Sequence, residues 1–363
     1  MKVALLSFNF GPYCVRLANG LARHAEVLLV MPRNISEPFR FGLDPAVELF
    51  QLDSPRLRQP ARQLRATGSA IRRIRAFEPD VIHYQAGHLW FNFAWPALRR
   101  FPLVVSIHES RHHLGDDDSA TTPQWIMDLG YRRADRVIVH GEQLRGAVVA
   151  DLGLPRDIID VVPPVPDIVL SEADVANVVE EDPHLILFYG RIWPYKGLDY
   201  LIRAEPLISA RVPEARIKIA GSGEDFERYR RLMANPEHFI LRIERIPDEE
   251  IPGMIGAAAV VVLPYIDGSV SGVVPIAYTF GKPVIATSVG ILPEMVEHGR
   301  TGLVVPPRDE QALAAAVVDL LTDAGRRHAL GENARRMVAT VFDPETTAAA
   351  SIETYERAIR SRR

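Results

Sequence analysis

Short apolar runs rich in β-branched residues alternate along this chain with longer segments of helical pattern. In the first half such runs occur at Val3–Ser7, Val27–Met31, Val81–His83, Leu103–Ile107 and Val137–Val139. Strands that alternate with helices form parallel sheets covered by helices on both faces. We therefore predict an α/β fold made of doubly wound parallel sheets.

The same alternation starts again in the second half of the chain. A proline-rich stretch at Val162–Pro166 and an acidic stretch at Glu180–Pro183 interrupt the first series. The second series comprises Leu185–Tyr189, Ile217–Ala220, Phe239–Leu241, Val260–Leu263 and Val284–Ala286. A length of 363 residues accommodates two domains of ordinary size. Two parallel sheets, one in each half of the chain, are thus expected.

The break between the two series sets the predicted domain boundaries. Residues 1–165 are expected to form the first domain, 166–184 a linker and 185–342 the second domain. Residues 343–363 are predicted to form a helix that packs back on the first domain. Asp309 and Asp343 are expected to cap the N-termini of two helices near the end of the chain.

Composition excludes several classes of protein. Hydrophobic residues make up 47% of the chain and charged residues 24%, which is typical of globular proteins rather than disordered or fibrous ones. The net charge of -4, without basic patches interleaved with aromatic residues, argues against nucleic acid as a partner. The best apolar run, Ala257–Leu263, is far too short to span a membrane. The single cysteine, Cys14, excludes an intrachain disulfide and favours a reducing, cytoplasmic location.

The strongest local signal lies directly after Leu185–Tyr189, where Gly190 and Arg191 are followed by Lys196 just before a helical segment. Only four of the 42 basic residues are lysines, so a lysine at this position is unusual. A guanidinium and an ammonium beside a helix N-terminus can converge on one anionic group. This pattern predicts a diphosphate-binding loop, although two ordinary surface cations would produce the same sequence.

Two further loops follow predicted strands. The first contains Gly221 and Gly223, which would allow the backbone to approach a phosphate or a ribose closely, or simply form a strand-to-helix turn. The dinucleotide-binding fingerprint is absent, because its third glycine is missing. The second loop is rich in small residues, and we expect its hydroxyls and amides to bind phosphate or sugar hydroxyls: Ser269, Ser271, Gly272 and Val273. Lys282, beyond this loop, is expected at the surface.

Taken in order, these segments resemble a known family. The Gly-Arg-x4-Lys-Gly and Gly-Ser-Gly-Glu segments, the stretch Gly281–Glu294 and the stretch His298–Val304 are similar to those of the retaining glycosyltransferases of family 4. The resemblance implies the GT-B fold, with two Rossmann-like domains facing across a cleft. It also implies transfer of a sugar from a nucleotide diphosphate sugar to a glycan, lipid-linked or small-molecule acceptor, in cell-envelope or polysaccharide biosynthesis. The donor is then a co-substrate, with UDP favoured over GDP, and no further cofactor is expected.

The first half carries the resemblance more loosely. Val105–Glu109, followed by His113 and Gly115-Asp116, is similar to a histidine-containing segment of one branch of the family. The resemblance implies that His108 lines the donor-sugar pocket, whereas a lone histidine is more often structural. Acceptor contacts are expected from Gly11, His83 and Glu109, although local hydrogen bonding explains His83 equally well.

The chain departs from the family at two positions. Family members commonly carry two glutamates with seven residues between them, where this sequence has Gly268 and Ile276. Glu294 is a candidate substitute, although it can equally cap a helix. Recognition of the base is expected from backbone groups near Ile246.

The resemblance also implies a mechanism, to which there are two alternatives. It implies front-face attack with retention, assisted by Arg191 and Lys196 at the leaving diphosphate and without a metal ion. The missing glutamates leave open a catalytically silent sugar-nucleotide-binding protein. A nucleotide-sugar epimerase of the same fold is the other alternative, although the acid-base carboxylates that it needs are not evident.

An arginine-rich segment stands apart from these motifs. Residues Arg56 to Arg75 include seven arginines and no acidic residue, with Leu57, Leu64, Ile71 and Ile74 interleaved. This pattern predicts an amphipathic helix that docks on anionic lipid at the inner face of a membrane, or a solvated basic helix.

Overall fold

Two compact units make up the chain, and each is built on one parallel sheet. The computed structural model describes all residues except 57, 86–87, 112–122, 170–178, 269 and 363. Within the described part, residues 1–111, 123–169 and 341–362 form the N-terminal unit, and residues 179–340 form the C-terminal unit. The predicted linker is therefore divided, because 166–169 belong to the first unit and 179–184 to the second.

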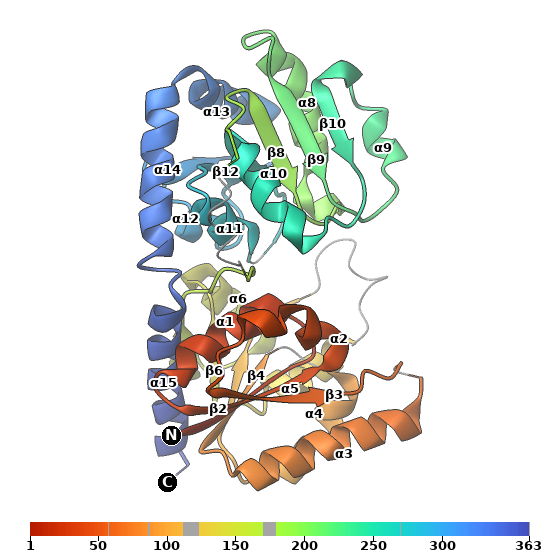
Figure 1. Ribbon diagram of the computed structural model, residues 1–363, viewed down its shortest axis with the longest axis vertical. Coiled ribbons are helices and arrows are strands. Elements are labelled where there is room, and N and C mark those ends of the chain that lie inside the picture. The colour runs from red at the N-terminus through yellow and green to blue at the C-terminus, as the bar shows by residue number, and fades with distance from the viewer. Residues whose placement is uncertain (57, 86–87, 112–122, 170–178, 269, 363) are drawn as a thin grey trace. The chain divides into compact units, whose positions relative to one another are not determined.

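The N-terminal unit contains a seven-stranded sheet in the order β3-β2-β1-β4-β5-β6-β7 (Figure 1). Its strands are β1 (Lys2–Ser7), β2 (Glu26–Pro32), β3 (Val47–Leu52), β4 (Val81–Gln85), β5 (Leu103–Ser106), β6 (Arg136–Val139) and β7 (Ile159–Val161). All neighbouring strands run parallel. The strand order reverses between β1 and β4, and ligands of such sheets bind beyond the carboxyl ends of the strands near this point.

Helices cover both faces of this sheet (Figure 1). They are α1 (Gly11–Ala22), α2 (Arg33–Ser36), α3 (Pro60–Phe77), α4 (Leu89–Ala94), α5 (Gln124–Tyr131), α6 (Glu142–Leu152) and α15 (Pro344–Arg360), with short 3-10 turns η1 (Glu37–Gly42), η2 (Trp95–Leu98) and η3 (Arg156–Ile158). α1 and α15 pack together on one face, around a core that includes Leu5, Leu17 and Tyr355. α3 lies on the opposite face.

The C-terminal unit contains a six-stranded parallel sheet in the order β10-β9-β8-β11-β12-β13. Its strands are β8 (Leu185–Tyr189), β9 (Arg216–Ala220), β10 (Phe239–Arg242), β11 (Val260–Leu263), β12 (Val284–Thr287) and β13 (Gly302–Val305). The order reverses between β8 and β11, so the loops after these two strands lie at the switch point of this sheet.

The helical elements of the C-terminal unit are α8 (Leu198–Ser209), α9 (Glu227–Arg230), α10 (Ile251–Ala257), α11 (Val273–Thr279), α12 (Leu292–Met295), α13 (Glu310–Thr322) and α14 (Ala324–Val338), with η4 (Pro194–Lys196), η5 (Pro236–His238) and η6 (Asp248–Glu250). α8 and α13 pack together over a shared core with the sheet. The predicted caps are confirmed, since Asp309 accepts a hydrogen bond from the amide of Ala312 and Asp343 from the amides of Glu345 and Thr346.

Three strands were missed by the sequence analysis, and each lies at the edge of a sheet. β3, β7 and β13 are terminal in their strand orders. β3 reads Val-Glu-Leu-Phe-Gln-Leu and is only partly buried, and β7 has three residues. β3 therefore lacks the continuous apolar run that marks a buried parallel strand, and Asp160 and Gly302 shorten the apolar runs of β7 and β13.

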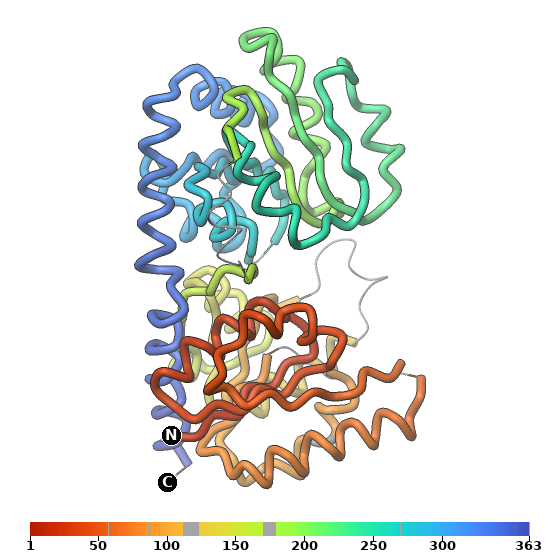
Figure 2. The backbone as a smooth tube through the Cα atoms, in the orientation of Figure 1, coloured from red at the N-terminus to blue at the C-terminus, as the bar shows by residue number. Residues whose placement is uncertain are grey.

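The last helix of the chain belongs to the N-terminal unit, as Figure 2 shows by the position of both termini. α15 contacts α1, and the Thr347 hydroxyl donates to the carbonyl of Pro163 over 3.1 Å. Near the end of the chain, the Arg362 guanidinium donates to Asp135 over 2.8 Å.

The arginine-rich helix differs from its prediction in start and orientation. α3 begins at Pro60, and its buried positions are Gln63, Thr67, Ala70 and Ile74. Leu64 was expected on the apolar face, but its side chain is 62% exposed. Leu57 lies outside the described residues. Among the described residues, no helix combines the length and apolarity that crossing a membrane requires.

Candidate functional site

The loop after β8 brings the two predicted cations to the switch point of the C-terminal sheet. Gly190 and Arg191 follow the strand directly, and η4 carries the chain to Lys196. Gly197 then has a φ of 63°, and a Cβ at this position would lie 2.0 Å from the carbonyl oxygen of Pro264. Only glycine fits a left-handed turn this close to the β11 loop. Gly197 thus places Lys196 against the β11 loop, at the start of α8.

Two buried tyrosines hold the cations. The Arg191 guanidinium donates to the Tyr195 hydroxyl over 2.9 Å. The Lys196 ammonium lies 3.7 Å from the ring centre of Tyr265 and 4.9 Å from that of Tyr195. Aromatic faces attract a cation without neutralising it. Both cations are thus positioned by tyrosine side chains, and the sequence analysis identified neither tyrosine.

The loop after β9 packs directly on the loop after β8. A Cβ on Gly221, whose φ is 148°, would lie 1.8 Å from the carbonyl oxygen of Gly190. Gly223 forms a bridge with Ile192, and the amide of Glu224 donates to the carbonyl of Ile192 over 3.0 Å. Both glycines thus let the two loops pack against each other, and the Glu224 amide already has an acceptor. The predicted ligand contact at Gly221 and Gly223 stays a prediction. The helix expected here is also short, because α9 spans only Glu227–Arg230.

The loop after β11 joins the same cluster. Ser271 is 2% exposed, and its hydroxyl lies 3.1 Å from that of Tyr265 and 3.4 Å from the amide of Val273. Gly272 is the N-cap of α11. Ser269 lies outside the described residues. Ser271 therefore positions Tyr265, the tyrosine whose ring lies against the Lys196 ammonium.

The positions of the absent family glutamates are unsuited to acidic side chains in this chain. Gly268 has a φ of 146°, a conformation that other residues rarely adopt. Ile276 is 5% exposed within α11. The candidate substitute Glu294 is exposed in the first turn of α12, and Ile246 is buried after β10. Among the described residues, no acidic side chain replaces the glutamates at the same backbone positions.

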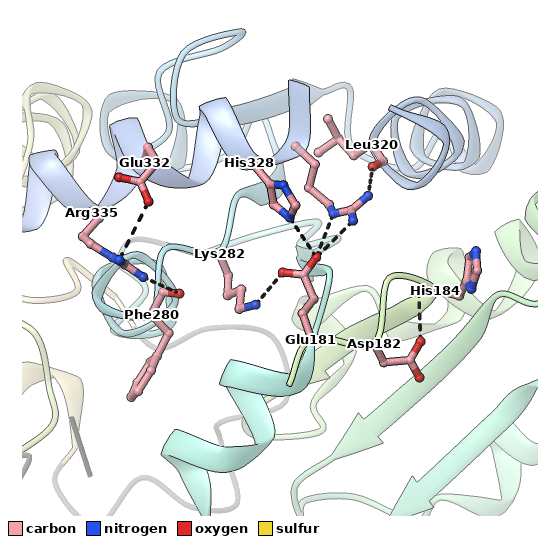
Figure 3. A network of polar contacts seen from close by, with 10 residues as sticks. Glu181, Asp182, His184, Phe280, Lys282, Leu320, His328, Glu332 and Arg335 are labelled. Carbon is pink, nitrogen blue, oxygen red and sulfur yellow. Dashed lines mark hydrogen bonds and ion pairs between the residues drawn. The ribbon is translucent and has the colours of Figure 1, made fainter. Parts of the chain in front are cut away.

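The prediction that Lys282 is a surface residue is wrong. Its side chain is 9% exposed, and its ammonium lies 2.6 Å from the Glu181 carboxylate (Figure 3). Arg327, which is 2% exposed, approaches the same carboxylate at 3.0 Å. Burial alone would raise the pKa of Glu181, but hydrogen bonds and charge attraction from Lys282 and Arg327 lower it overall. The acidic stretch before β8 is thus anchored to α14 by a charged cluster.

The N-terminal unit holds a second cluster, made of neutral aromatic and amide side chains. His108 follows β5, and its Nε2 lies 2.9 Å from Oε1 of Gln85 on β4. Its ring lies 4.4 Å from that of Phe10 and 4.9 Å from that of His140, measured between ring centres. Burial lowers the pKa of His108 well below its usual range, and nearby His140 and His83 lower it further.

Of the predicted acceptor-side residues, His83 is corrected by the structure. It lies within β4, is 1% exposed, and bonds only to buried neighbours, so it cannot contact an acceptor directly. Gly11 begins α1, where a Cβ would lie 2.8 Å from the carbonyl oxygen of Ile35, so packing explains its small size. Glu109 is partly exposed beside His108. His113 and Gly115-Asp116 lie outside the described residues.

Comparison with known proteins agrees with this geometry. Residues 171–337 match the family model for group 1 glycosyl transferases, and residues 10–164 match the glycosyl transferase 4-like domain. A D-inositol 3-phosphate glycosyltransferase of Catenulispora acidiphila is 30% identical over 82% of this chain and 76% of its own length. A GDP-mannose-dependent mannosyltransferase of Mycolicibacterium smegmatis, acting on a phosphatidylinositol monomannoside, is 36% identical over 41% of this chain and 42% of its own.

Solved structures show the same architecture. Sucrose-phosphate synthase from Thermosynechococcus elongatus superposes with a TM-score of 0.73 at 20% identity, over 99% of this chain and 100% of that one. HepE of Anabaena, in complex with UDP, gives a TM-score of 0.70 at 20% identity, over 98% of this chain and 100% of that one. Two parallel α/β units with these neighbours define the GT-B fold. With both family models matched in order along its two units, the chain belongs to the GT4-type glycosyltransferases of the GT-B fold.

Proposed function

We propose that this glycosyltransferase transfers a sugar, with retention of anomeric configuration, from a nucleotide diphosphate sugar to a glycan, lipid-linked or small-molecule acceptor. The observation that carries the proposal is the placement of Arg191 and Lys196 after β8, each held by a buried tyrosine. A role in cell-envelope or polysaccharide biosynthesis is part of the proposal. A metal ion is not part of the proposed mechanism.

The chemistry follows from the charges. When the bond between the anomeric carbon and the diphosphate breaks, negative charge develops on the departing phosphate oxygen. Two fixed cations stabilise that charge more strongly than they stabilise the intact donor, which lowers the barrier. Each charge-assisted hydrogen bond contributes about 1.5–3 kcal/mol. Arg191 and Lys196 together therefore account for a large part of the proposed leaving-group stabilisation.

The proposed donor is a UDP-sugar. Support comes from HepE, whose solved complexes contain UDP and UDP-glucose, while the mannosyltransferase of Mycolicibacterium smegmatis is named for GDP-mannose. His108 is proposed to contact the transferred sugar and Glu109 the acceptor. The remaining proposed donor contacts are the backbone at Ile246 and the residues Gly190, Gly221, Gly223, Ser269, Ser271, Gly272, Val273 and Glu294.

A donor panel tests this function. The purified protein is incubated with UDP-glucose, UDP-N-acetylglucosamine or GDP-mannose, and release of the nucleoside diphosphate is followed with and without candidate acceptors. We expect slow release from one UDP-sugar, faster release with acceptor, and a product of unchanged anomeric configuration by NMR. Tight binding without release across the panel would instead identify a silent binding protein.

We also propose that α3 makes peripheral contact with an anionic membrane. Arg62, Arg65 and Arg72 are exposed on this helix beside the exposed Leu64. Arg73 pairs with Glu48, and Arg75 donates to the carbonyl of Ala97 through Nε and Nη2. Arg65 donates to the carbonyl of Ala61, in its own helix, through Nε. The remaining basic face fits lipid phosphates, each charge contributing about 1 kcal/mol near the surface.

Liposome flotation tests the membrane contact. Replacing the three exposed arginines of α3 with glutamine should weaken binding to vesicles containing phosphatidylglycerol by about 100-fold. A matched control replaces the exposed arginines at α9, Arg228, Arg230 and Arg231, and should leave binding unchanged. Equal flotation of the α3 variant and the parent protein would contradict the proposal.

A further inference from the structure

A chain of hydrogen bonds links the C-terminal helix to His108. We propose that Tyr355, on α15, is a positioning residue that fixes which ring nitrogen of His108 carries the proton. It acts through two residues of β4, His83 and Gln85. The inference rests on the proposed function, in which His108 contacts the transferred sugar.

The contacts run without a break through the interior of the N-terminal unit. The Tyr355 hydroxyl lies 2.6 Å from Nδ1 of His83. On the other side of that ring, Nε2 lies 3.1 Å from Nε2 of Gln85 and 2.8 Å from the hydroxyl of Ser106. The second atom of the same amide, Oε1 of Gln85, lies 2.9 Å from Nε2 of His108. Tyr355 is fully buried, and His83 and Gln85 are each 1% exposed.

The chemistry of the amide assigns the protons. An amide nitrogen only donates, so Nε2 of His83 must accept from Gln85 and cannot carry a proton. The single proton of the neutral His83 ring is then on Nδ1 and is donated to Tyr355. An amide oxygen only accepts, so Nε2 of His108 must donate to Gln85. Neutral His83 is thus protonated at Nδ1 and neutral His108 at Nε2. Moving either proton to the other ring nitrogen requires rotation of the Gln85 amide.

The C-terminal helix α15 provides the residue at the end of this hydrogen-bond chain, Tyr355. In the assigned direction the Tyr355 oxygen accepts the Nδ1 proton of His83 over 2.6 Å. α15 therefore supplies the acceptor on which the direction of the hydrogen-bond chain depends.

This arrangement determines which ligand groups can hydrogen bond to His108. Nε2 is occupied by Gln85, so a ligand can hydrogen bond to this ring only at Nδ1. In the assigned tautomer Nδ1 is unprotonated, which makes it an acceptor for a sugar hydroxyl and a poor partner for a phosphate oxygen. The same preference holds while the ring stays neutral, and burial lowers the pKa of both His83 and His108.

The first test reads the tautomer directly and does not depend on activity. In protein with 15N-labelled histidine, NMR distinguishes protonated from unprotonated ring nitrogens, and the spectrum of His108→Ala assigns the His108 signals among the 11 histidines. We expect the parent protein to show Nε2 protonated and Nδ1 unprotonated. In Tyr355→Phe the buried Nδ1 proton of His83 loses its acceptor, which favours the reversed chain, so the His108 proton should move toward Nδ1. An unchanged His108 spectrum in Tyr355→Phe would overturn the proposal.

The second test separates positioning from stability. Tyr355→Phe should lower kcat/KM for the donor about 10-fold in the parent protein, as expected for one misplaced hydrogen bond, and should have no further effect in the His108→Ala background. Circular dichroism and denaturant unfolding of Tyr355→Phe guard against a folding defect. An equal loss in both backgrounds would show that Tyr355 acts only on the fold.

The control is Tyr84→Phe. Tyr84 is also buried on β4, but it alternates with His83 and Gln85 and faces the other side of the sheet. Its replacement should change neither the tautomer nor kcat/KM, and a change equal to that of Tyr355→Phe would contradict a specific chain. If His108→Ala itself leaves activity intact, the proposed role of His108 is wrong, while the NMR result still decides the hydrogen-bond chain.

Discussion

One unit carries a neutral polar cluster, and the other carries a basic one. In the N-terminal unit, His83, His108 and His140 lie close together and burial keeps them neutral. In the C-terminal unit, the basic side chains of Arg191 and Lys196 contact tyrosines, Arg191 through a hydroxyl and Lys196 over the ring of Tyr265. A neutral cluster selects hydroxyl groups, whereas a cationic one attracts phosphate. The two clusters therefore differ in the kind of chemical group that each can bind.

The largest effect is expected in the cationic cluster. Lys196→Ala and Arg191→Ala should each lower sugar transfer by about 100- to 1,000-fold, because each removes a charge from the departing diphosphate. Transfer or donor-hydrolysis rates measure the loss, and circular dichroism verifies that the variants fold. Arg211→Ala, an exposed cation beyond the other end of α8, is the matched control and should retain activity. Unchanged turnover in either variant would contradict the proposed role of that residue at the diphosphate.

Mild acid should act first on the neutral cluster. In the folded protein burial lowers the pKa of His83 to about 3 and that of His140 to about 4, from an ordinary value of 6.5. Below 6.5 the unfolded chain binds protons that the folded chain does not, so stability falls as the pH decreases from about 6.5 toward 4. At about pH 5 each histidine should cost about 2 kcal/mol.

Hydrogen exchange with mass spectrometry locates this loss. Peptides from β4 and α15 should lose protection at a higher pH than peptides from β12 and α13. Simultaneous loss in both units would contradict the contrast between neutral and charged clusters.

Replacing Glu181 tests how much the charged cluster of the C-terminal unit contributes to stability. Glu181→Gln leaves Lys282 and Arg327 buried without a counter-charge and should lower stability by about 1–3 kcal/mol, measured by denaturant unfolding. The pKa of Glu181 is lowered in the folded state, so its contribution is present above the ordinary value of 4.5 and is lost as the pH falls below it. Glu180→Gln, at an exposed neighbour, should have no such effect.

The smallest effect is expected at the support of Lys196. Tyr265→Leu removes the aromatic face under the ammonium and should lower kcat/KM about 5- to 10-fold, in line with the strength of a cation–π contact. Tyr265→Phe keeps the ring, loses only the contact with Ser271, and should cost less. Equal losses in the two variants would show that the hydroxyl, rather than the ring, positions Lys196.

The sequence predicted the central strands and the cationic loop well. β8 and β11 were predicted with the bounds that the structure gives, because strands buried on both faces are continuous apolar runs. β3 was missed because polar residues interrupt its partly exposed run, and β7 and β13 were missed because Asp160 and Gly302 shorten their apolar runs. Tyr195, Tyr265 and Gln85 were missed because tyrosine and glutamine carry no charge and no fixed spacing that marks them as supports.

The sequence by itself determined the two α/β units, the order of their motifs and the position of the cations after a strand. These properties depend on local hydrophobic periodicity and on glycine turns, which are readable along the chain. Only the tertiary structure decided that Lys282 is buried with Glu181, that Gly221 packs on Gly190, and that Tyr355 bonds to His83. Such contacts join residues far apart in sequence, and their energies depend on burial and on atomic distance, which no local pattern encodes.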